Sequence, residues 1–292
     1  MADTLFVIDT MYLIFRNFYA MRGNLRSPSG VPTGAVFGLL HSLDFLRTRL
    51  KMEYCVCCTE SECEVFRHKI SPIYKENRPP AAPELKVQIP LALEMCRHLG
   101  FKVLSADGFE ADDVIASLTC MAVKKGWPVR IISKDKDMAQ LLAMDGDIAI
   151  ETAFSNGDSS YIDRNNCAEK YGVPPELIAD WLALKGDTSD NVIGIKGIGD
   201  KTASKLLLKC GGLDELMKEP AAAGRFAAAI EESRERLLLN KRLVELRADA
   251  CAGLTESVES IEQFRIAEPD AEAADFFANL GISVSRTRFN VR

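Results

Sequence analysis

Residues 5–9 read Leu-Phe-Val-Ile-Asp, a short run typical of a buried strand that ends on a carboxylate. Strand-like runs of the same kind follow at residues 54–59, 101–105, 129–133 and 147–151. Helical patterns alternate with them at residues 34–50, 87–99, 111–125 and 136–142. Strands that alternate with helices indicate a mostly parallel central sheet flanked by helices on both faces, so we predict an α/β fold.

Two segments depart from this alternation. From about residue 171 the pattern becomes helical, so we predict an α/β domain over residues 1–168 and a helical region over residues 169–292, with one long charged helix that ends near Leu246. Residues 66–90 carry five prolines among basic and aromatic residues and form an insertion in the first domain. An irregular segment of that length inside a compact domain is usually functional or disordered.

The composition limits the class of protein. Lys and Arg number 36 against 42 Asp and Glu, which gives a net charge of −6, and 47% of the 292 residues are hydrophobic. These values exclude wholesale disorder and small disulfide scaffolds. The sequence has no apolar run of the roughly 18 residues typical of a membrane helix. Its first residues do not resemble a signal peptide, so we predict a cytoplasmic protein with no membrane partner.

The nine cysteines fit reduced thiols better than a disulfide framework. A zinc site is an alternative for the cysteines at positions 55, 57, 58 and 63. No Cys-x2-Cys pair or partnered histidine cluster stands near them, so a buried strand that uses cysteine as a small apolar residue explains them better.

Acidic residues follow four successive predicted strands. Asp9 ends the first strand, Glu60 follows the second, and further acids follow the third and fourth. Because the carboxyl ends of parallel strands share one edge, these side chains can converge, together with two acids of GDTSDN at residues 186–191. Converging carboxylates repel unless cations neutralise them, and oxygen ligands favour Mg²⁺ or Mn²⁺. The candidate metal ligands are Asp9, Glu60, Glu110, Asp112, Asp113, Asp135, Asp137, Asp187 and Asp190.

Each acid also has a plain structural explanation. The acids at positions 110, 112 and 113 can start a helix by stabilising its dipole, and those at positions 135 and 137 can lie in a solvated turn. Recurrence after four successive strands favours a shared site over these separate explanations.

Residues 194–209 read GIKGIGDKTASKLLLK, a glycine-rich turn followed by a lysine-rich helical pattern. A Walker loop is excluded because Asp200 separates Gly199 from Lys201, and a dinucleotide-binding motif needs a preceding strand. We predict a helix, the turn, and a second helix from about Asp200, whose free N–H groups and lysines bind phosphates. The carbonyls of the turn can also hold a monovalent cation such as K⁺. The alternative is a solvated, lysine-rich helix face.

Seven motifs occur in the order of one known family. They are VID with Asp9 and Arg16, GVPTGAVFGL at 30–39, FRH at 66–68 with Tyr74, Lys75 and Arg78, GFEADDVIASL at 108–118, DKDM at 135–138, GDTSDN at 186–191 and GIKGIGDKTA at 194–203. The chain resembles the 5′ nuclease, or flap endonuclease-like, family. It is most similar to the N-terminal 5′-to-3′ exonuclease domain of bacterial DNA polymerase I and its stand-alone relatives. The resemblance covers nearly the whole chain and implies a PIN-like α/β domain with a helix-turn-helix-type DNA-binding motif in the helical region.

The resemblance implies two divalent-ion sites. The first comprises Asp9, Glu110, Asp112 and Asp113, and the second Asp135, Asp137, Asp187 and Asp190. Two Mg²⁺ ions, or Mn²⁺ in their place, lie about 4 Å apart in such sites, where they activate water and stabilise the attacking and leaving oxygens of phosphodiester hydrolysis. Catalytic roles are implied for Lys75, Arg78 and Asp113.

The resemblance also implies the DNA contacts. The insertion at 66–90 corresponds to an arch or clamp over the 5′ single strand, where Tyr74 stacks on an unpaired base and Lys75 adds positive charge beside the scissile phosphate. The implied DNA-binding residues are Arg16, Arg67, Tyr74, Lys75, Arg78, Lys196, Gly197, Gly199, Lys201, Thr202 and Lys205.

The sequence departs from the family pattern in two places. Glu60 stands where the family has an aspartate, and Thr59 precedes it where an aromatic residue is usual. We predict that Glu60 is a first-site ligand, with Glu62 as the alternative. Lys134 stands where a small residue is common.

We therefore predict a metal-dependent 5′-to-3′ exonuclease and flap endonuclease that cuts DNA at 5′ ends, flaps and nicks, and RNA primers on DNA, in primer removal and repair. The resemblance implies a monomer, either a complete protein or the front of a chain with a polymerase domain. One alternative is a branched-DNA-binding protein of the same fold whose altered Glu60 site is inactive. A small-substrate phosphatase is another, but it leaves the insertion and the glycine-rich turn unexplained.

Overall fold

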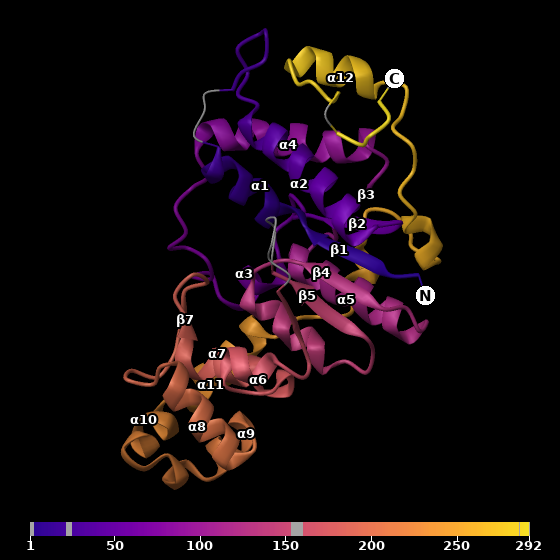
Figure 1. The fold of residues 1–292 in the computed structure, drawn as a ribbon. Coiled ribbons are helices and arrows are strands. Elements are labelled where there is room, and N and C mark those ends of the chain that lie inside the picture. Colours follow the sequence, from indigo (N-terminus) through magenta and orange to yellow (C-terminus); the bar gives the residue numbers. More distant parts are fainter. Residues whose placement is uncertain (1–2, 22–24, 153–159, 286, 292) are drawn as a thin grey trace.

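The computed structural model describes residues 3–21, 25–152, 160–285 and 287–291 (Figure 1). Its centre is a six-stranded sheet in the order β3-β2-β1-β4-β5-β6. The strands are β1 (Leu5–Asp9), β2 (Tyr54–Cys58), β3 (Lys102–Leu104), β4 (Val129–Ile132), β5 (Ile148–Glu151) and β6 (Tyr161–Asp163). All neighbours pair in parallel except β5 and β6. The predicted mostly parallel sheet is confirmed, and β6 is a strand that the sequence patterns did not predict.

The register of β1 decides where the acidic residues gather. Asp9 is the last paired residue of β1 and lies opposite Cys58, the last residue of β2. On the other side of β1, Ile8 lies opposite Ile132, the last residue of β4. Three adjacent strands therefore end at one edge of the sheet, and the acids that follow β2 and β4 reach the same edge as Asp9.

The sheet separates two cores. Phe6 and Ile8 pack under one helical layer and Leu5 and Val7 under the other, because side chains alternate along the strand. The first layer contains α1 (Thr10–Ala20), α2 (Gly34–Leu50) and α4 (Pro83–His98), and the second contains α5 (Ala111–Lys124), the 3₁₀ helix η1 (Lys136–Ala143) and α7 (Ile178–Lys185). A strand buried on both faces needs apolar residues at every position, which explains the continuous LFVI run.

The proline-rich insertion is more regular than its sequence indicates. It begins with α3 (Phe66–Ile70), passes through turns, and joins α4 at Pro83, four residues before the predicted helix start at residue 87. Proline is favoured in the first turn of a helix, where its missing N–H group has no partner to lose.

The second half of the chain forms a cluster of short helices. Its elements are α6 (Cys167–Tyr171), η2 (Pro175–Leu177), the hairpin of β7 (Gly186–Asp187) and β8 (Val192–Ile193), α8 (Asp200–Cys210), α9 (Leu213–Lys218), η3 (Pro220–Phe226), α10 (Ala227–Glu232) and α11 (Arg234–Val244). The long charged helix that we predicted is divided at Ser233 into α10 and α11.

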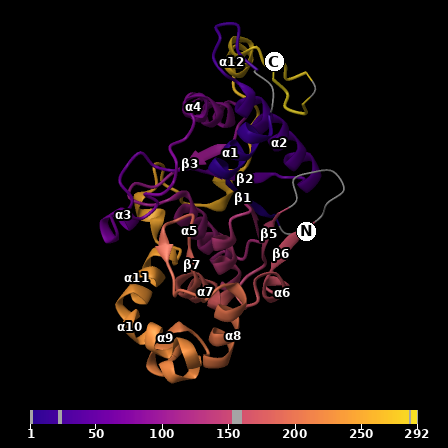
Figure 2. The same ribbon diagram turned by 90° about the vertical axis from the view of Figure 1, so that its left-hand side faces the viewer.

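After α11 the chain returns to the sheet. It passes through η4 (Ala250–Gly253) and η5 (Ile261–Phe264) and ends near α12 (Ala273–Leu280). Figure 2 shows α8, α9 and α10 at one end of the molecule and α12 at the other. All nine cysteines are free, as predicted. Within the described ranges, no helix has both the length and the apolar character needed to cross a bilayer.

A strap formed by residues 266–270 ties the C-terminal segment to the end of α4. The Ala267 N–H donates to the Gly100 carbonyl at 3.0 Å, and the Asp270 carboxylate lies 2.9 Å from Nδ1 of His98. Gly100 has a φ of +85°, and a Cβ atom there would lie 2.2 Å from the Ala267 carbonyl oxygen. Glycine is therefore required at this position for both conformation and space.

Gly100→Ala should lower the free energy of unfolding more than Gly126→Ala. Both glycines have positive φ after a helix, but a Cβ at Gly126 would meet no atom within 4 Å. Gly126→Ala should cost about 1 kcal/mol from backbone strain alone, and Gly100→Ala roughly 1–3 kcal/mol more because it displaces the strap. Urea unfolding of the two variants measures the difference, and equal losses would show that the strap adds no stability.

Candidate active site

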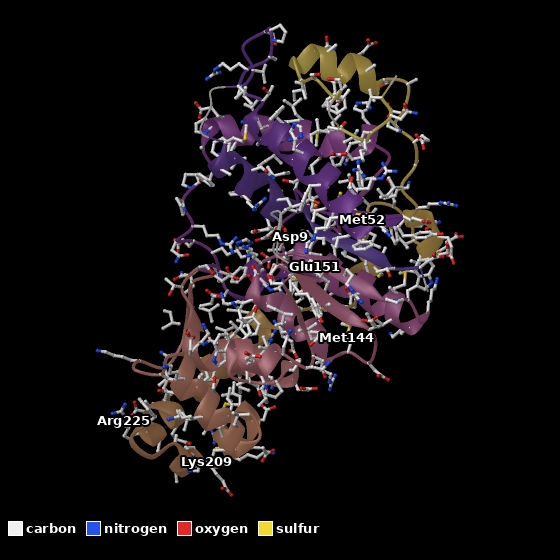
Figure 3. The ribbon with its side chains drawn as sticks, viewed as in Figure 1. Asp9, Met52, Met144, Glu151, Lys209 and Arg225 are labelled. Atoms are coloured by element: carbon white, nitrogen blue, oxygen red, sulfur yellow. The ribbon has the colours of Figure 1, made fainter. Side chains whose placement is uncertain are left out.

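A cavity of about 350 Å³ opens at the carboxyl edge of the sheet, and four carboxylates line it. They are Asp9, Glu60, Asp112 and Asp135. The other walls are Met11, Tyr12, Phe15, Lys75, Arg78 and Lys134. A neighbouring cavity shares Glu60, Lys75 and Arg78 with it and adds Glu110. Figure 3 places Asp9 near the middle of the molecule, where the two halves of the chain meet.

Asp9 is held rigidly at the end of β1. One carboxylate oxygen accepts the Tyr12 N–H at 2.9 Å at the start of α1, and the other accepts the Ser133 hydroxyl at 2.9 Å. Burial raises the pKa of Asp9 to about 6, and the charge of Asp135 adds to the rise. The fold therefore keeps an acid here that favours a neutralising proton or cation.

Glu60 and Asp112 show the same preference. Desolvation, with repulsion from Glu110 and Asp9, raises the pKa of Glu60 to about 7, although the residue is exposed to solvent on one side of the cavity. Burial and repulsion from Asp135 and Asp9 raise the pKa of Asp112 well above its ordinary range. Several carboxylates that disfavour their own ionised forms are a fitting ligand set for a hard divalent cation.

A second group consists of Asp137, Asp187 and Asp190. Each offers one carboxylate oxygen, and these oxygens lie within 4.8 Å of one another. Oδ1 of Asp137 is buried without a hydrogen-bond partner in the part of the chain that the structure describes. An orphaned buried carboxylate oxygen beside two other acids is the arrangement expected of a cation ligand. These residues therefore fit a divalent metal ion.

Two lysines and an arginine partly neutralise the acids. Lys136 lies 2.6 Å from Asp187, Arg78 lies 2.5 Å from Asp190, and Lys75 forms a short ion pair with Glu110. Burial works to lower the pKa of Lys75, but its acidic neighbours outweigh burial and raise it. Lys136 was not among the predicted site residues, although its position inside DKDM pointed to it.

Tyr74 does not stand free to stack on a base. Its side chain is 3% exposed, and its hydroxyl lies 3.0 Å from both Glu110 and Asp190. The hydroxyl is satisfied by two buried acids and the ring packs in the core, which corrects the stacking prediction for this structure.

Arg67 and Asp113 also differ from the prediction. Arg67 is 1% exposed and donates to both oxygens of Asp113, at 2.5 and 2.9 Å, so it cannot reach a DNA phosphate in this conformation. Asp113 is fully buried, and neither of the two cavities has it among its described lining residues. The structure therefore places this pair beneath the first turn of α5 rather than at the surface of the site.

The insertion is fastened to the β7–β8 hairpin. Lys75 N–H donates to the Asp190 carbonyl at 3.1 Å, Asn77 to the Thr188 carbonyl at 2.6 Å, and Asn191 to the Ile73 carbonyl at 2.7 Å. Lys75 and Asn191 both have φ of 57°, a left-handed conformation that is uncommon for such residues. These bonds hold Lys75 and Arg78 over the carboxylates.

The glycine-rich turn follows β8, packs against the C-terminal end of α7 and leads into α8. A Cβ at Gly194 would lie 2.1 Å from the Lys185 backbone, so only glycine allows the turn to pack against α7. The second helix begins at Asp200, as predicted, and Lys196, Lys201 and Lys205 are exposed on this side. Gly197 and Gly199 lie within the turn, and Thr202 is half-buried in the first turn of α8. Arg16, the remaining candidate, is half-buried on α1.

Comparison with known proteins identifies the family. Residues 4–172 match the family described as the 5′-3′ exonuclease, N-terminal resolvase-like domain, and residues 173–272 match the 5′-3′ exonuclease, C-terminal SAM fold. The chain belongs to the 5′-3′ exonuclease family. A 5′-3′ exonuclease of Aquifex aeolicus is 35% identical over 91% of this chain and 88% of its own length.

A longer relative and a solved structure are also similar to this chain. DNA polymerase I of Pseudomonas aeruginosa is 35% identical over 92% of this chain, which spans only 29% of that protein. A structure of T5 5′-exonuclease with divalent zinc ions has the same fold, with a TM-score of 0.69 over 95% of this chain and 99% of that one at 20% identity.

The metal-free protein should lose stability as the pH rises from about 4 to about 7. The folded-state pKa values of Asp9 and Glu60 are about 6 and about 7, against ordinary values of 3.8 and 4.5. The folded state therefore holds protons that the unfolded chain releases, so this stabilisation is complete at low pH and gone above pH 7. Mg²⁺ should raise the unfolding temperature more at pH 8 than at pH 6, because metal binds the ionised acids. Thermal unfolding in EDTA and in Mg²⁺ measures both effects.

Glu60→Gln should reduce both the pH slope and the gain from Mg²⁺. Glu62→Gln is the matched control, since Glu62 lines the neighbouring cavity next to Glu60. A Glu60→Gln protein that keeps the wild-type slope and metal gain would exclude Glu60 as a ligand.

Proposed function

We propose that this chain is a metal-dependent 5′-to-3′ exonuclease and flap endonuclease that hydrolyses phosphodiesters at 5′ ends, flaps and nicks of DNA. The observation that carries the proposal is that two clusters of acidic side chains lie close together at the carboxyl ends of the sheet strands, with basic side chains beside them, in a chain that belongs to this family. RNA primers on DNA are included among its substrates, with roles in primer removal and repair. It acts as a monomer on DNA in the cytoplasm, as a separate protein or at the front of a polymerase chain.

The carboxylates hold two divalent ions, Mg²⁺ or Mn²⁺ in its place. Asp9, Glu60, Glu110, Asp112 and Asp135 serve the first, and Asp137, Asp187 and Asp190 serve the second, which Asp135 adjoins. When bound, the ions supply an activated water and stabilise charge on the phosphate. The raised pKa values of Asp9 and Glu60 support this assignment, since metal is the natural substitute for their protons.

Lys75 and Arg78 act as catalytic residues on the phosphate. Both line the cavity that contains Asp9, and both keep a raised pKa because acids surround them. Their fixed positive charges stabilise the negative charge that develops on the phosphoryl oxygens, at no cost of reorganisation during the reaction.

The glycine-rich turn and α8 hold duplex DNA away from the chemistry. Lys196, Lys201 and Lys205 bind phosphates without reading the sequence, together with the N–H groups at the start of α8 and the Thr202 hydroxyl. The carbonyls of the turn hold a monovalent cation such as K⁺, which would neutralise a phosphate of the bound strand.

The protein should cut a 5′-labelled double-flap DNA in Mg²⁺ and not in EDTA. Asp112→Asn and Asp187→Asn should each reduce the rate at least about 100-fold, since each removes one ligand and the transition-state stabilisation it supports. The matched control is Glu256→Gln, an exposed acid paired with Lys102 on β3. Gel analysis of single-turnover cleavage measures the rates.

Tight binding without incision in Mg²⁺ or Mn²⁺ would favour the alternative of an impaired branched-DNA-binding protein. Glu60→Asp would then be the informative variant, because it restores the family's residue. Failure to bind duplex DNA at all would favour a small-substrate phosphatase.

Lys201→Gln and Lys205→Gln should each weaken duplex binding in Ca²⁺ and lower the salt dependence of log Kd by about 1. Cleavage at saturating DNA should keep the wild-type rate, because these lysines contact the duplex and not the scissile phosphate. Lys218→Gln on α9 is the control, since Lys218 pairs with Glu215. Fluorescence anisotropy across a salt series measures the slopes, and unchanged slopes would place the duplex elsewhere.

A further inference from the structure

The C-terminal end of α11 is buried at Leu243 and Val244 and is hydrogen-bonded to elements beside the active site. The Leu243 and Glu245 carbonyls accept hydrogen bonds from Arg67 at 2.7 and 3.0 Å. Gln140 of η1 donates to the Val244 carbonyl at 2.9 Å and accepts the Leu246 N–H at 3.1 Å. The end of α11 is thus fixed to both α3 and η1 by side chains that satisfy its free backbone groups.

Arg67 is the centre of this arrangement. Its guanidinium donates to Asp113 through two nitrogens and lies 2.9 Å from Glu110. Phe66 lies beneath it, 4.6 Å from ring centroid to guanidinium carbon, and the exposed Arg247 covers Phe66 from 5.2 Å. A planar guanidinium with this many fixed partners cannot be replaced by the single charge of a lysine.

Asp113 has its acceptors fully engaged. One oxygen accepts the Arg247 N–H at 2.9 Å as well as Arg67, and the other accepts the Glu110 N–H at 3.2 Å as well as Arg67. Four protein donors leave this carboxylate little capacity for a metal ion. Its reciprocal bond with the Glu110 backbone instead defines the start of α5.

Glu110 is the side chain that this pair controls. Its Oε2 lies 2.9 Å from Arg67 and 3.0 Å from the Tyr74 hydroxyl, while Oε1 is paired with Lys75 at the cavity. Arg67 therefore fixes the buried oxygen and leaves the other oxygen toward the cavity.

We propose that Arg67 and Asp113 are a positioning pair that fixes the Glu110 carboxylate for metal binding and anchors it to the end of α11. The inference rests on the proposed function, because it takes Glu110 as a metal ligand. Neither member of the pair contacts metal or DNA.

α11 extends the anchor to the DNA-binding turn. Asn240, one turn before Leu243, is 3% exposed and donates to the Ala183 carbonyl at 3.0 Å and to the Ile193 carbonyl at 2.9 Å. Ile193 directly precedes Gly194 of the glycine-rich turn. One short helix thus supports both the turn and, through Arg67, a catalytic carboxylate.

The test measures Mn²⁺ binding to the DNA-free protein by electron paramagnetic resonance at pH 8. Arg67→Lys and Asp113→Asn should each lower the Mn²⁺ affinity about tenfold, as is usual when a residue behind a metal ligand is changed, with the number of bound ions unchanged. The double variant should be no weaker than either single variant, because the pair acts as a unit. Duplex binding in Ca²⁺ and its salt slope should stay at wild-type values.

Arg130→Lys is the matched control. Arg130 forms two hydrogen bonds with the Asp147 carboxylate, at 2.9 and 3.2 Å. The pair lies near the start of β4, at the amino ends of the strands and away from the acidic clusters. This variant should leave Mn²⁺ affinity unchanged.

Three outcomes would overturn the proposal. Loss of one bound ion in Asp113→Asn, with none in Arg67→Lys, would make Asp113 a ligand. A salt slope lowered by about 1 in Arg67→Lys would make Arg67 a DNA contact. Unchanged Mn²⁺ affinity in both variants would leave the pair without a positioning role.

Folding of the variants is controlled by circular dichroism. If a single variant fails to fold, the Arg67→Gln, Asp113→Asn double variant removes both charges together and avoids a lone buried charge. Its Mn²⁺ affinity must still fall about tenfold with the stoichiometry kept. A wild-type protein that binds Mn²⁺ but never cuts DNA would contradict the proposed nuclease function. The positioning pair could still be tested in that case, because its test measures Mn²⁺ affinity and not cleavage.

Discussion

Electrostatic repulsion at the carboxyl edge of the sheet is the constraint on which the rest of the structure depends. β1, β2 and β4 end side by side, so the acids that follow them are forced together. Basic side chains from distant parts of the chain partly neutralise these acids: Lys75 forms an ion pair with Glu110, Lys136 with Asp187 and Arg78 with Asp190. At Asp9 and Glu60, desolvation and repulsion from neighbouring acids outweigh the nearby Lys75, so the pKa rises. The edge is thus built for cations, some of them supplied by the protein and the rest by metal.

How much of this the sequence could predict depended on whether the signal was local. β1 and α2 were predicted with their observed ends, since a continuous apolar strand and a long helical run of apolar residues can both be recognised from neighbouring residues. β6 and the β7–β8 hairpin were missed because strands of two or three residues carry no period; β3 is as short, but its run at residues 101–105 directly follows a helical pattern that Gly100 ends. The split between α10 and α11 was missed because Ser233 does not forbid a helix.

The candidate site was predicted as a set of residues but not as a set of roles. The acids could be found from their position after strands. The burial of Arg67 could not be predicted, because the segment that covers it is far away in sequence: its partner, the Leu243 carbonyl, lies 176 residues further along the chain. Tyr74 is similar, since its partner Asp190 lies 116 residues away. A basic or aromatic residue in a proline-rich segment looks exposed until the chain that covers it has been placed. Family resemblance transfers the motif, while the contacts decide what each member does.

The charge distribution explains how an acidic protein can hold a polyanion. The net charge of −6 is not spread evenly, because many acids are concentrated at the sheet edge while Lys196 of the glycine-rich turn and Lys201 and Lys205 of α8 are exposed. Duplex DNA can therefore be attracted to the turn whatever the state of the edge. A phosphate approaching Asp9 and Glu60 meets repulsion until cations balance those acids. DNA binding at the turn and hydrolysis at the sheet then differ in their requirement for divalent metal. α11 links the two regions, because it is hydrogen-bonded to Ile193 beside the turn and to Arg67 beside the acids.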